Sequence, residues 1–517
     1  MWEKSPRLTK ITATLACAGL VTACSAGSTA TRVGRIANSN AVVVATFAAP
    51  ASLDFTRTAG AAIPGALMAN VYESLVRINA QGDIEPWLAT SWDISADRTE
   101  YVFHLREGVK FSNGDDFTAD TAKFSIDRVK TDAWTNGLKA QMKPVKNTEV
   151  IDKHTLKVTL DKPSNQWLYS MATFVGAMMT PSGVDKLATQ PVGTGPYVVD
   201  QWAVGQSLTF TARDGYWGQP PHSQTAAIRY FSDAVGATNA LQSGDVDVVW
   251  AMQSPELIKP LTARGNYDVH VGTTNGEVLL SMNHRRAPFN DVRVRQAIMH
   301  AIDRQAVIDT AWDGYGTDTG GAPVPPTDPW FEKSERYPFD PERARQLLLE
   351  AGINESNNDI VFSVPSLPYT SAISELVVSQ LKDVGLDVTI ESTEFPAVWL
   401  AKVLKGKDYD MSLIAHVEPR DIPTLFGNKD YYLGYDSPAT RDALAKADAG
   451  SQEEYAQYLG QAVDQIMADA AADTLFNFPN IVLARHGVTG IDPNVRTDGL
   501  DLAVIAKPPA EQHKENR

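Results

Sequence analysis

The hydrophobic pattern between residues 355 and 415 alternates between strand-like and helix-like segments. Apolar runs at 360–364, 386–390 and 409–415 have the length of buried strands, and segments with helical spacing at about 372–385 and 397–404 connect them. Strands joined by helix-length connections usually pair in parallel through a right-handed crossover. We therefore predict a parallel α/β sheet here, whose ligands would lie beyond the carboxyl ends of its strands.

Capping residues set the bounds of two further helices in this half of the chain. Asn290 or Asp291 can cap a helix whose apolar positions repeat at helical spacing as far as Ile302. Asp340 precedes a proline at the first helical position, and Gly352 ends that helix.

The first part of the chain is richer in strands. Residues 41–47 form an apolar strand-like run, residues 101–105 alternate, and residues 148–160 predict two strands joined by a turn. Between them, a helix is expected to begin near Asp120 and to end at about Val129.

One uncharged apolar stretch, residues 11–23, follows Lys4, Arg7 and Lys10. It is shorter than the roughly 20 residues that span a bilayer as a helix. This order of a positive flank and a short apolar run predicts a secretory signal peptide over residues 1–23.

Residues 21–24, Val-Thr-Ala-Cys, resemble a bacterial lipobox. The resemblance implies cleavage before Cys24 and diacylation of its sulfur, and a second acyl chain would make the anchoring stable. The alternative is a secreted protein with a chance cysteine near its cleavage site. Residues 24–40 are rich in small polar residues and predict a flexible tether, and the polar tail 507–517 is expected to be disordered.

Composition narrows the class of protein. The 517 residues are 43 % hydrophobic and 21 % charged, which is ordinary for a globular chain of about three domain-sized units. The net charge of −16 argues against a general nucleic-acid binder, which needs a basic face. Two cysteines exclude a disulfide-rich scaffold and a cysteine-built metal centre.

The sequence contains no familiar catalytic motif. Its histidines do not form His-Glu-x-x-His, and neither a Gly-x-Ser-x-Gly elbow nor a phosphate-binding P-loop is present. Residues 193–197 begin like a dinucleotide-binding loop but lack its third glycine, so a tight turn is predicted there. We assign no catalytic residue, no metal and no cofactor, although an enzyme remains an alternative because acid–base residues need no motif.

Several motifs occur in collinear order along most of the chain, among them Leu-Arg-Glu-Gly-Val-Lys-Phe at 105–111 and Pro-Phe-Asn-Asp-Val-Arg at 288–293. The other blocks lie at 70–75, 85–92, 117–128, 193–197, 214–218, 244–247 and 340–344. Together they resemble the extracytoplasmic solute-binding proteins of ABC importers, in the peptide/nickel-binding family, solute-binding protein family 5.

The resemblance implies an α/β, two-lobe periplasmic-binding-protein-like fold of type II with an extra subdomain. Lobe I would comprise residues 41–270, with the subdomain at about 80–170, and residues 478–506 would return to it. Lobe II would comprise residues 271–477. The hinge crossings would lie near 271–277 and 476–481, and a ligand would close the cleft between the lobes.

The implied function is that of a lipid-anchored extracytoplasmic receptor. It would capture a small solute, which we expect to be an oligopeptide, and deliver it to the permease and ATPase subunits of an ABC importer. We expect a monomer that touches the membrane only through its lipid and binds no nucleic acid. A hydrolase on the same scaffold and a lipoprotein adhesin are the alternatives from other classes.

The candidate ligand residues fall into two groups. The loop on lobe I that matches the pocket-lining segment of relatives contributes Thr56, Arg57, Thr58 and Gly60. Lobe II contributes Tyr369 and Trp399, and the loop after strand 409–415 contributes His416, Glu418, Arg420 and Asp421. Equally, that charged loop could be a solvated surface whose charges compensate one another.

The chain departs from the family where relatives clamp the ends of a peptide. In the family an Asp in this loop holds the ligand's α-ammonium group, whereas Pro419 stands at that position here. An arginine that clamps the carboxylate in relatives is also missing from residues 366–369. These differences leave longer peptides, opine-like chelators or another amphiphile, and the alternative ligand is a metal–chelator complex held by His416 and Arg420.

Overall fold

The computed structural model describes residues 41–508 except 59, 264, 368 and 498. The predicted signal peptide, Cys24, the tether and the last nine residues lie outside this described part. Lys507, where the disordered tail was expected to begin, lies inside it, and its ammonium group contacts Asp247 at 3.0 Å.

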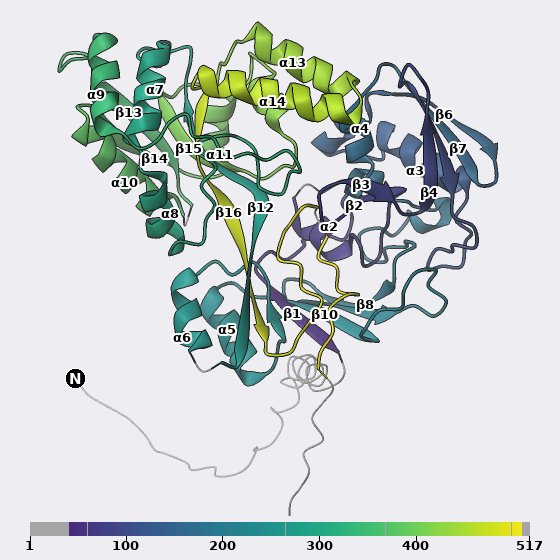
Figure 1. Cartoon of the computed structure of the whole chain (residues 1–517). Helices are drawn as coiled ribbons and strands as arrows, with labels where there is room; N and C mark the ends of the chain where they lie inside the picture. The colour runs from purple at the N-terminus through teal and green to yellow at the C-terminus, as the bar shows by residue number, and fades with distance from the viewer. Residues whose placement is uncertain (1–40, 59, 264, 368, 498, 509–517) are drawn as a thin grey trace, which may run out of the picture.

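A ten-stranded sheet runs through both halves of the molecule in the order β14-β13-β15-β12-β16-β11-β1-β10-β9-β8 (Figure 1). Its two long central strands, β12 (Tyr267–Met282) and β16 (Ala472–Arg485), pair antiparallel. In Figure 1 these two strands run from the upper-left part of the molecule down to its lower part.

The predicted parallel sheet is confirmed on one side of this pair. β13 (Asp359–Pro365) pairs in parallel with β14 (Asp387–Thr393) and with β15 (Met411–His416). The connections are α10 (Thr370–Asp383), and α11 (Ala397–Trp399) continued by a π-helical turn at Leu400–Lys405. β15 then pairs antiparallel with β12, which places the carboxyl end of β15 beside the middle of β12.

The helices around these strands include the two whose caps were predicted. Asp291 caps α7 (Val292–Ala301), and Asp340 caps α9 (Pro341–Glu350), in both cases by accepting a backbone N–H. The remaining helices of this half are α8 (Arg304–Trp312), α12 (Ile422–Phe426), α13 (Pro438–Ala449) and α14 (Gln452–Ala468).

On the other side of the central pair, β1 (Val42–Thr46) lies between β10 (Thr225–Tyr230) and β11 (Val248–Val249) and is parallel to both. β9 (Ser207–Ala212) and β8 (Tyr197–Ala203) complete this edge. Further elements here are α2 (Ala62–Leu67), α5 (Ala234–Ser243), α6 (Ile258–Thr262), β2 (Val76–Ile78) and β3 (Ile84–Pro86).

A separate four-stranded antiparallel sheet has the order β4-β5-β7-β6. Its strands are β4 (Ala89–Ile94), β5 (Glu100–Leu105), β6 (Val145–Asp152) and β7 (Thr155–Leu160). The predicted helix near residue 120 is α3 (Ala119–Lys130), which begins with a capping box at Thr118 and Thr121. α4 (Asn165–Ser170) follows the sheet.

The buried apolar residues form separate cores in the two halves. One set of cores is built from residues 42–261 and 481–505, and the other from residues 278–476. The predicted two-lobe fold is therefore confirmed, and we call the halves lobe I and lobe II in that order. Between their cores, residues 274–276 of β12 face only Phe478 of β16, because the ladder is interrupted between Thr273 and Glu277. Such a bulge bends the strand locally.

Within the described residues, no helix is both long enough and apolar enough to cross a lipid bilayer.

Candidate functional site

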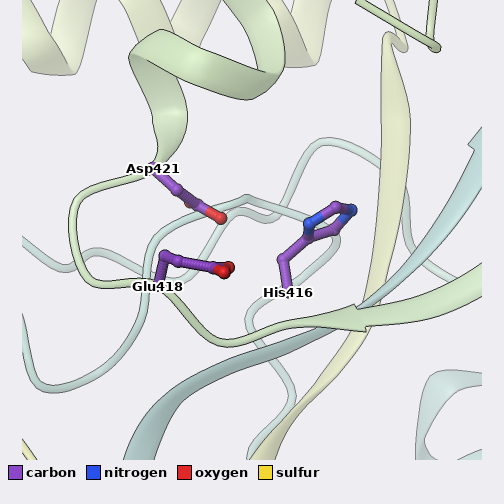
Figure 2. Close-up of side chains that lie close together, drawn as sticks. All are labelled: His416, Glu418 and Asp421. Carbon is purple, nitrogen blue, oxygen red and sulfur yellow. The ribbon is translucent and has the colours of Figure 1, made fainter. Parts of the chain in front are cut away.

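The loop that follows β15 brings three of its predicted residues together. β15 ends at His416, and Glu418 and Asp421 lie between it and α12. A ring nitrogen of His416 and carboxylate oxygens of Glu418 and Asp421 lie within 4.8 Å of one another. In Figure 2 both carboxylates point towards the imidazole. A neutral imidazole with two carboxylates can hold a divalent cation or accept hydrogen bonds from an ammonium group.

The environment of His416 keeps its ring neutral. A ring nitrogen lies 2.9 Å from the hydroxyl of Tyr432. Burial lowers the pKa of His416 to about 4, although the negative charge of Glu418 acts in the opposite direction. The ring is therefore uncharged near pH 7 and cannot compensate the two carboxylates beside it.

Glu277 is a carboxyl group at this site that the sequence reasoning missed. It lies directly opposite His416 in the register of β12 and β15, so both side chains are on the same face of the sheet. Glu277 is 1 % exposed, and neither carboxyl oxygen has a hydrogen-bond partner among the described residues. The available signal was a lone acidic residue at the start of the apolar run 278–280.

Two further carboxyl groups act on Glu277. Burial raises its pKa well above the ordinary value, and the charges of Asp421 and Asp328 raise it further. The pKa of Asp421 is also raised, by burial and then by Glu418 and Asp328. Burial raises the pKa of Asp328 to about 7, against the opposing effect of Arg420. Burial is the largest cause of the raised pKa of each of the three groups, Glu277, Asp421 and Asp328.

Arg420 reaches from lobe II to lobe I. Its guanidinium carbon lies 3.8 Å from the ring centre of Tyr169 on α4, and it also lies over the rings of Trp330 and Tyr455. The Nε atom is buried without a hydrogen-bond partner. No ion pair found among the described residues joins Arg420 to a carboxylate. Its contacts are thus cation–π contacts with aromatic rings rather than pairing with Glu418 or Asp421.

Tyr369 and Trp399 have structural contacts. The hydroxyl of Tyr369 accepts a hydrogen bond from the backbone N–H of Ala415 at 3.0 Å, and its ring packs edge-on against Phe478 at the hinge bulge. Trp399 is 2 % exposed, and its indole N–H donates to Ser412 at 3.1 Å. We leave Trp399 out of the proposed site because its ring is enclosed by the core of lobe II.

The four residues predicted in the lobe I loop differ from one another in burial and in contacts. Thr56 is fully buried, and its hydroxyl donates to Asp54 at 2.7 Å. Arg57 is exposed and lines a surface cavity of about 740 Å³ together with residues of α3, all in lobe I. The backbone N–H of Thr58 donates to Asp54, whereas Gly60 is exposed and a Cβ there would meet no atom within 4 Å. Only Gly60 keeps the open backbone that the prediction requires.

A second cavity of about 740 Å³ in lobe I borders the hinge. Its lining includes Arg77, Trp87, Phe174, Tyr216 and Arg496. The backbone carbonyl of Arg496 accepts a hydrogen bond from Asn275 in the bulge of β12. The volume of this cavity lies within the range of small-ligand sites, about 300–1,000 Å³.

The lobes also contact each other away from the hinge. One carboxylate oxygen of Asp448 on α13 accepts hydrogen bonds from the hydroxyl of Ser164 and the backbone N–H of Gln166, both at 2.9 Å. The side chain of Asn165 donates to the carbonyls of Ala447 and Gly450. α4 therefore lies against the end of α13 (Figure 1), and the lobes are closed in this structure.

Comparison with known proteins identifies relatives over most of the chain. The sequence model of the family described as bacterial extracellular solute-binding proteins, family 5 Middle, matches residues 83–425. Heme-binding protein A of Haemophilus influenzae is 30 % identical over 420 residues, which cover 73 % of this chain and 76 % of that protein. The glutathione-binding protein GsiB of Escherichia coli is 30 % identical over 350 residues, which cover 66 % and 67 %.

A solved structure agrees with this result. The ABC transporter-associated periplasmic binding protein DppA from Helicobacter pylori, in complex with the peptide STSA, superimposes with a TM-score of 0.73 at 25 % identity. The match covers 90 % of this chain and 98 % of that structure.

Proposed function

This chain belongs to the bacterial extracellular solute-binding proteins of family 5, and we propose that it encloses a small solute between its lobes and delivers it to the permease of an ABC importer. The observation that carries this proposal is the closed arrangement of two separately packed lobes around the acidic loop after β15. A solute that contacts both lobes only when they are closed shifts the hinge equilibrium towards the closed state. The solute leaves chemically unchanged.

We propose the lobe limits and crossings that the resemblance implies. Lobe I comprises residues 41–270 and 478–506, with the subdomain at about 80–170, and lobe II comprises residues 271–477. The crossings at 271–277 and 476–481 include the interrupted part of the β12–β16 ladder, which supports a hinge there.

An oligopeptide is the solute class that we propose. DppA from Helicobacter pylori was solved with a peptide, and GsiB is named for glutathione, which is itself a short peptide. With neither peptide-end clamp at its usual position, backbone pairing would supply much of the binding. The protein would act as a monomer beside the permease and ATPase subunits.

The test is a binding measurement with a random tetrapeptide library. The purified protein is incubated with the library, and retained peptides are identified by mass spectrometry after denaturation. We expect retained peptides to be intact and to reduce the radius of gyration in small-angle X-ray scattering. Cleaved peptides would indicate a hydrolase. Absence of both binding and compaction would contradict the receptor function for peptides.

A metal complex is a second candidate, because His416, Glu418 and Asp421 converge within 4.8 Å. Imidazole and carboxylate groups are suitable ligands for first-row divalent metals. Metal analysis of protein purified without chelators is the test, with His416→Ala as the matched variant. If this candidate is right, the wild-type protein should retain nickel or zinc and the variant should lose it. Wild-type protein that binds no metal and no chelate would remove this candidate.

We also propose that the protein is held at the outer face of the membrane by lipid on Cys24. The family is extracellular, and the lipobox at residues 21–24 supports the anchor.

A further inference from the structure

The region around Glu277 contains more carboxyl groups than basic groups: Glu277 is buried, Asp328 and Asp421 are half-buried, and Glu418 is exposed. Glu277 is 1 % exposed with both oxygens unpartnered. Asp421 and Asp328 are close enough to affect its charge, and Glu418 lies within 4.8 Å of Asp421. Thr327, beside Asp328, donates to Asn275 at 3.0 Å, which ties this loop to β12 two residues before Glu277.

Among the described residues, the nearby basic groups form no ion pair with these carboxyls, although the charge of Arg420 acts to lower the pKa of Asp328. The guanidinium of Arg420 is held over the rings of Tyr169, Trp330 and Tyr455. The ring of His416 is bonded to the hydroxyl of Tyr432, and its environment favours the neutral form. The tyrosines that interact electrostatically with these carboxyls, Tyr431, Tyr432 and Tyr455, bear no positive charge.

Glu73 in lobe I shows how this protein satisfies a structural buried carboxyl. Its two oxygens accept hydrogen bonds from Trp87, Thr194, Tyr216 and Trp217 at 2.6–3.0 Å. Glu277 is even more buried and accepts none. A buried carboxyl group whose oxygens have no hydrogen-bond partner is destabilising in either protonation state, so its presence calls for a partner that the described residues do not supply.

We propose that Glu277, together with Asp328 and Asp421, forms a receptor for a positively charged group of the solute. The group is an ammonium or guanidinium group of an organic solute, or a divalent metal ion carried by it. This inference rests on the proposed function and names the charge of the solute that the cleft selects. The solute's cation supplies the counter-charge, and closure of the lobes then removes both charges from water.

The position of Glu277 connects this charge to closure. It follows the bulge at residues 274–276, where β12 passes between the lobes. On the opposite side of the loop, Arg420 contacts Tyr169 of lobe I. A cation at Glu277 therefore lies between the hinge and an interlobe contact, where binding and closing are coupled.

The experiment compares the wild-type protein with Glu277→Gln and the matched control Glu375→Gln, an exposed glutamate of α10 in the same lobe. Each is titrated with three probes: a random tetrapeptide library with free amino termini, the same library acetylated at its amino termini, and NiCl₂ alone. We expect Glu277→Gln to weaken binding of the library with free amino termini, or of Ni²⁺ if the wild type binds the metal instead, by at least about tenfold. The control should bind like the wild type, and acetylated peptides should bind less well than free ones.

Melting temperatures without ligand test whether Glu277 is merely structural. If its carboxyl group is uncompensated, Glu277→Gln should melt at the same temperature as the wild type or higher. A lower melting temperature with unchanged binding would show a structural role and overturn the inference.

The remaining outcomes separate the inference from the proposed function. If both libraries bind equally to the wild type and to Glu277→Gln, the protein is a receptor and the inference is wrong. If only Ni²⁺ binds, and Glu277→Gln loses it, the inference holds with a metal as the cation, whereas the peptide proposal fails. If no probe binds, both are contradicted.

Discussion

Two poorly solvated carboxyl groups of lobe II, Asp473 and Asp328, differ in whether another residue compensates their charge. Asp473 is fully buried and is paired with Arg304 at 2.8 Å, so its charge is compensated within lobe II. Among the residues that the structure describes, Asp328 has no such partner within ion-pair distance, and burial raises its pKa to about 7. The first group stabilises the fold, whereas the second makes folding sensitive to pH.

This difference gives a prediction for Asp328. Its folded pKa is about 7 and its ordinary value is 3.8, so the folded protein binds more protons between those pH values. Its contribution to the free energy of unfolding is therefore complete below about pH 4 and is lost as the pH rises towards 7. The loss is at most about 1.4 kcal/mol per pH unit.

We expect Asp328→Asn to flatten the fall in melting temperature between about pH 5 and pH 7.5. The exposed Asp430→Asn in the same lobe is the control and should keep the wild-type profile. Identical profiles for all three proteins would show that Asp328 titrates normally.

At the scale of elements, α4 and α13 form a contact that depends on both lobes. The hydroxyl of Ser164 caps the first turn of α4 by accepting from Trp167, and it also donates to Asp448 of lobe II. Asp448 further accepts the N–H of Gln166, which would otherwise have no partner at the start of the helix. This contact can form only when the lobes are closed.

We predict that Asp448→Ala favours the open state. The loss of two hydrogen bonds should cost about 1–2 kcal/mol of closing free energy, or roughly 5- to 30-fold in the closed-to-open ratio. The radius of gyration without ligand should increase, and the affinity for retained peptides should fall. Asp442→Ala, which removes an exposed pair with Lys446 on the same helix, is the control. Equal radii and affinities would exclude a role for this contact in closure.

The whole molecule is a two-lobe binding protein whose predicted membrane anchor lies outside the described residues. If lipid on Cys24 is its attachment, the folded lobes have no need to contact the bilayer. We predict that Cys24→Ser releases the protein into the soluble fraction while its peptide binding is unchanged. Fractionation of cells that express each form measures this, with wild-type protein as the membrane-bound control. A variant that stays with the membrane would indicate a different mode of attachment.

Much of the local structure follows from the sequence because its causes are local. The caps at Asp291 and Asp340 depend on residues three or fewer positions away, and they occur as predicted. Apolar runs of strand length, joined by helical segments, sufficed to predict the parallel order of β13, β14 and β15. The preference of ligands for the carboxyl ends of parallel strands also predicted the loop after β15 as a candidate ligand loop.

The composition of the candidate site was decided by tertiary structure. Glu277 and His416 are neighbours only through the register of two antiparallel strands, and the loop that carries Asp328 is tied to β12 by a hydrogen bond from the adjacent Thr327 to Asn275. The sequence predicts Arg420 as a ligand residue, whereas in the structure Tyr169 of the other lobe covers one face of its guanidinium. Sequence periodicity records which face of an element is buried, whereas burial of a charge without a partner depends on segments far apart in the chain.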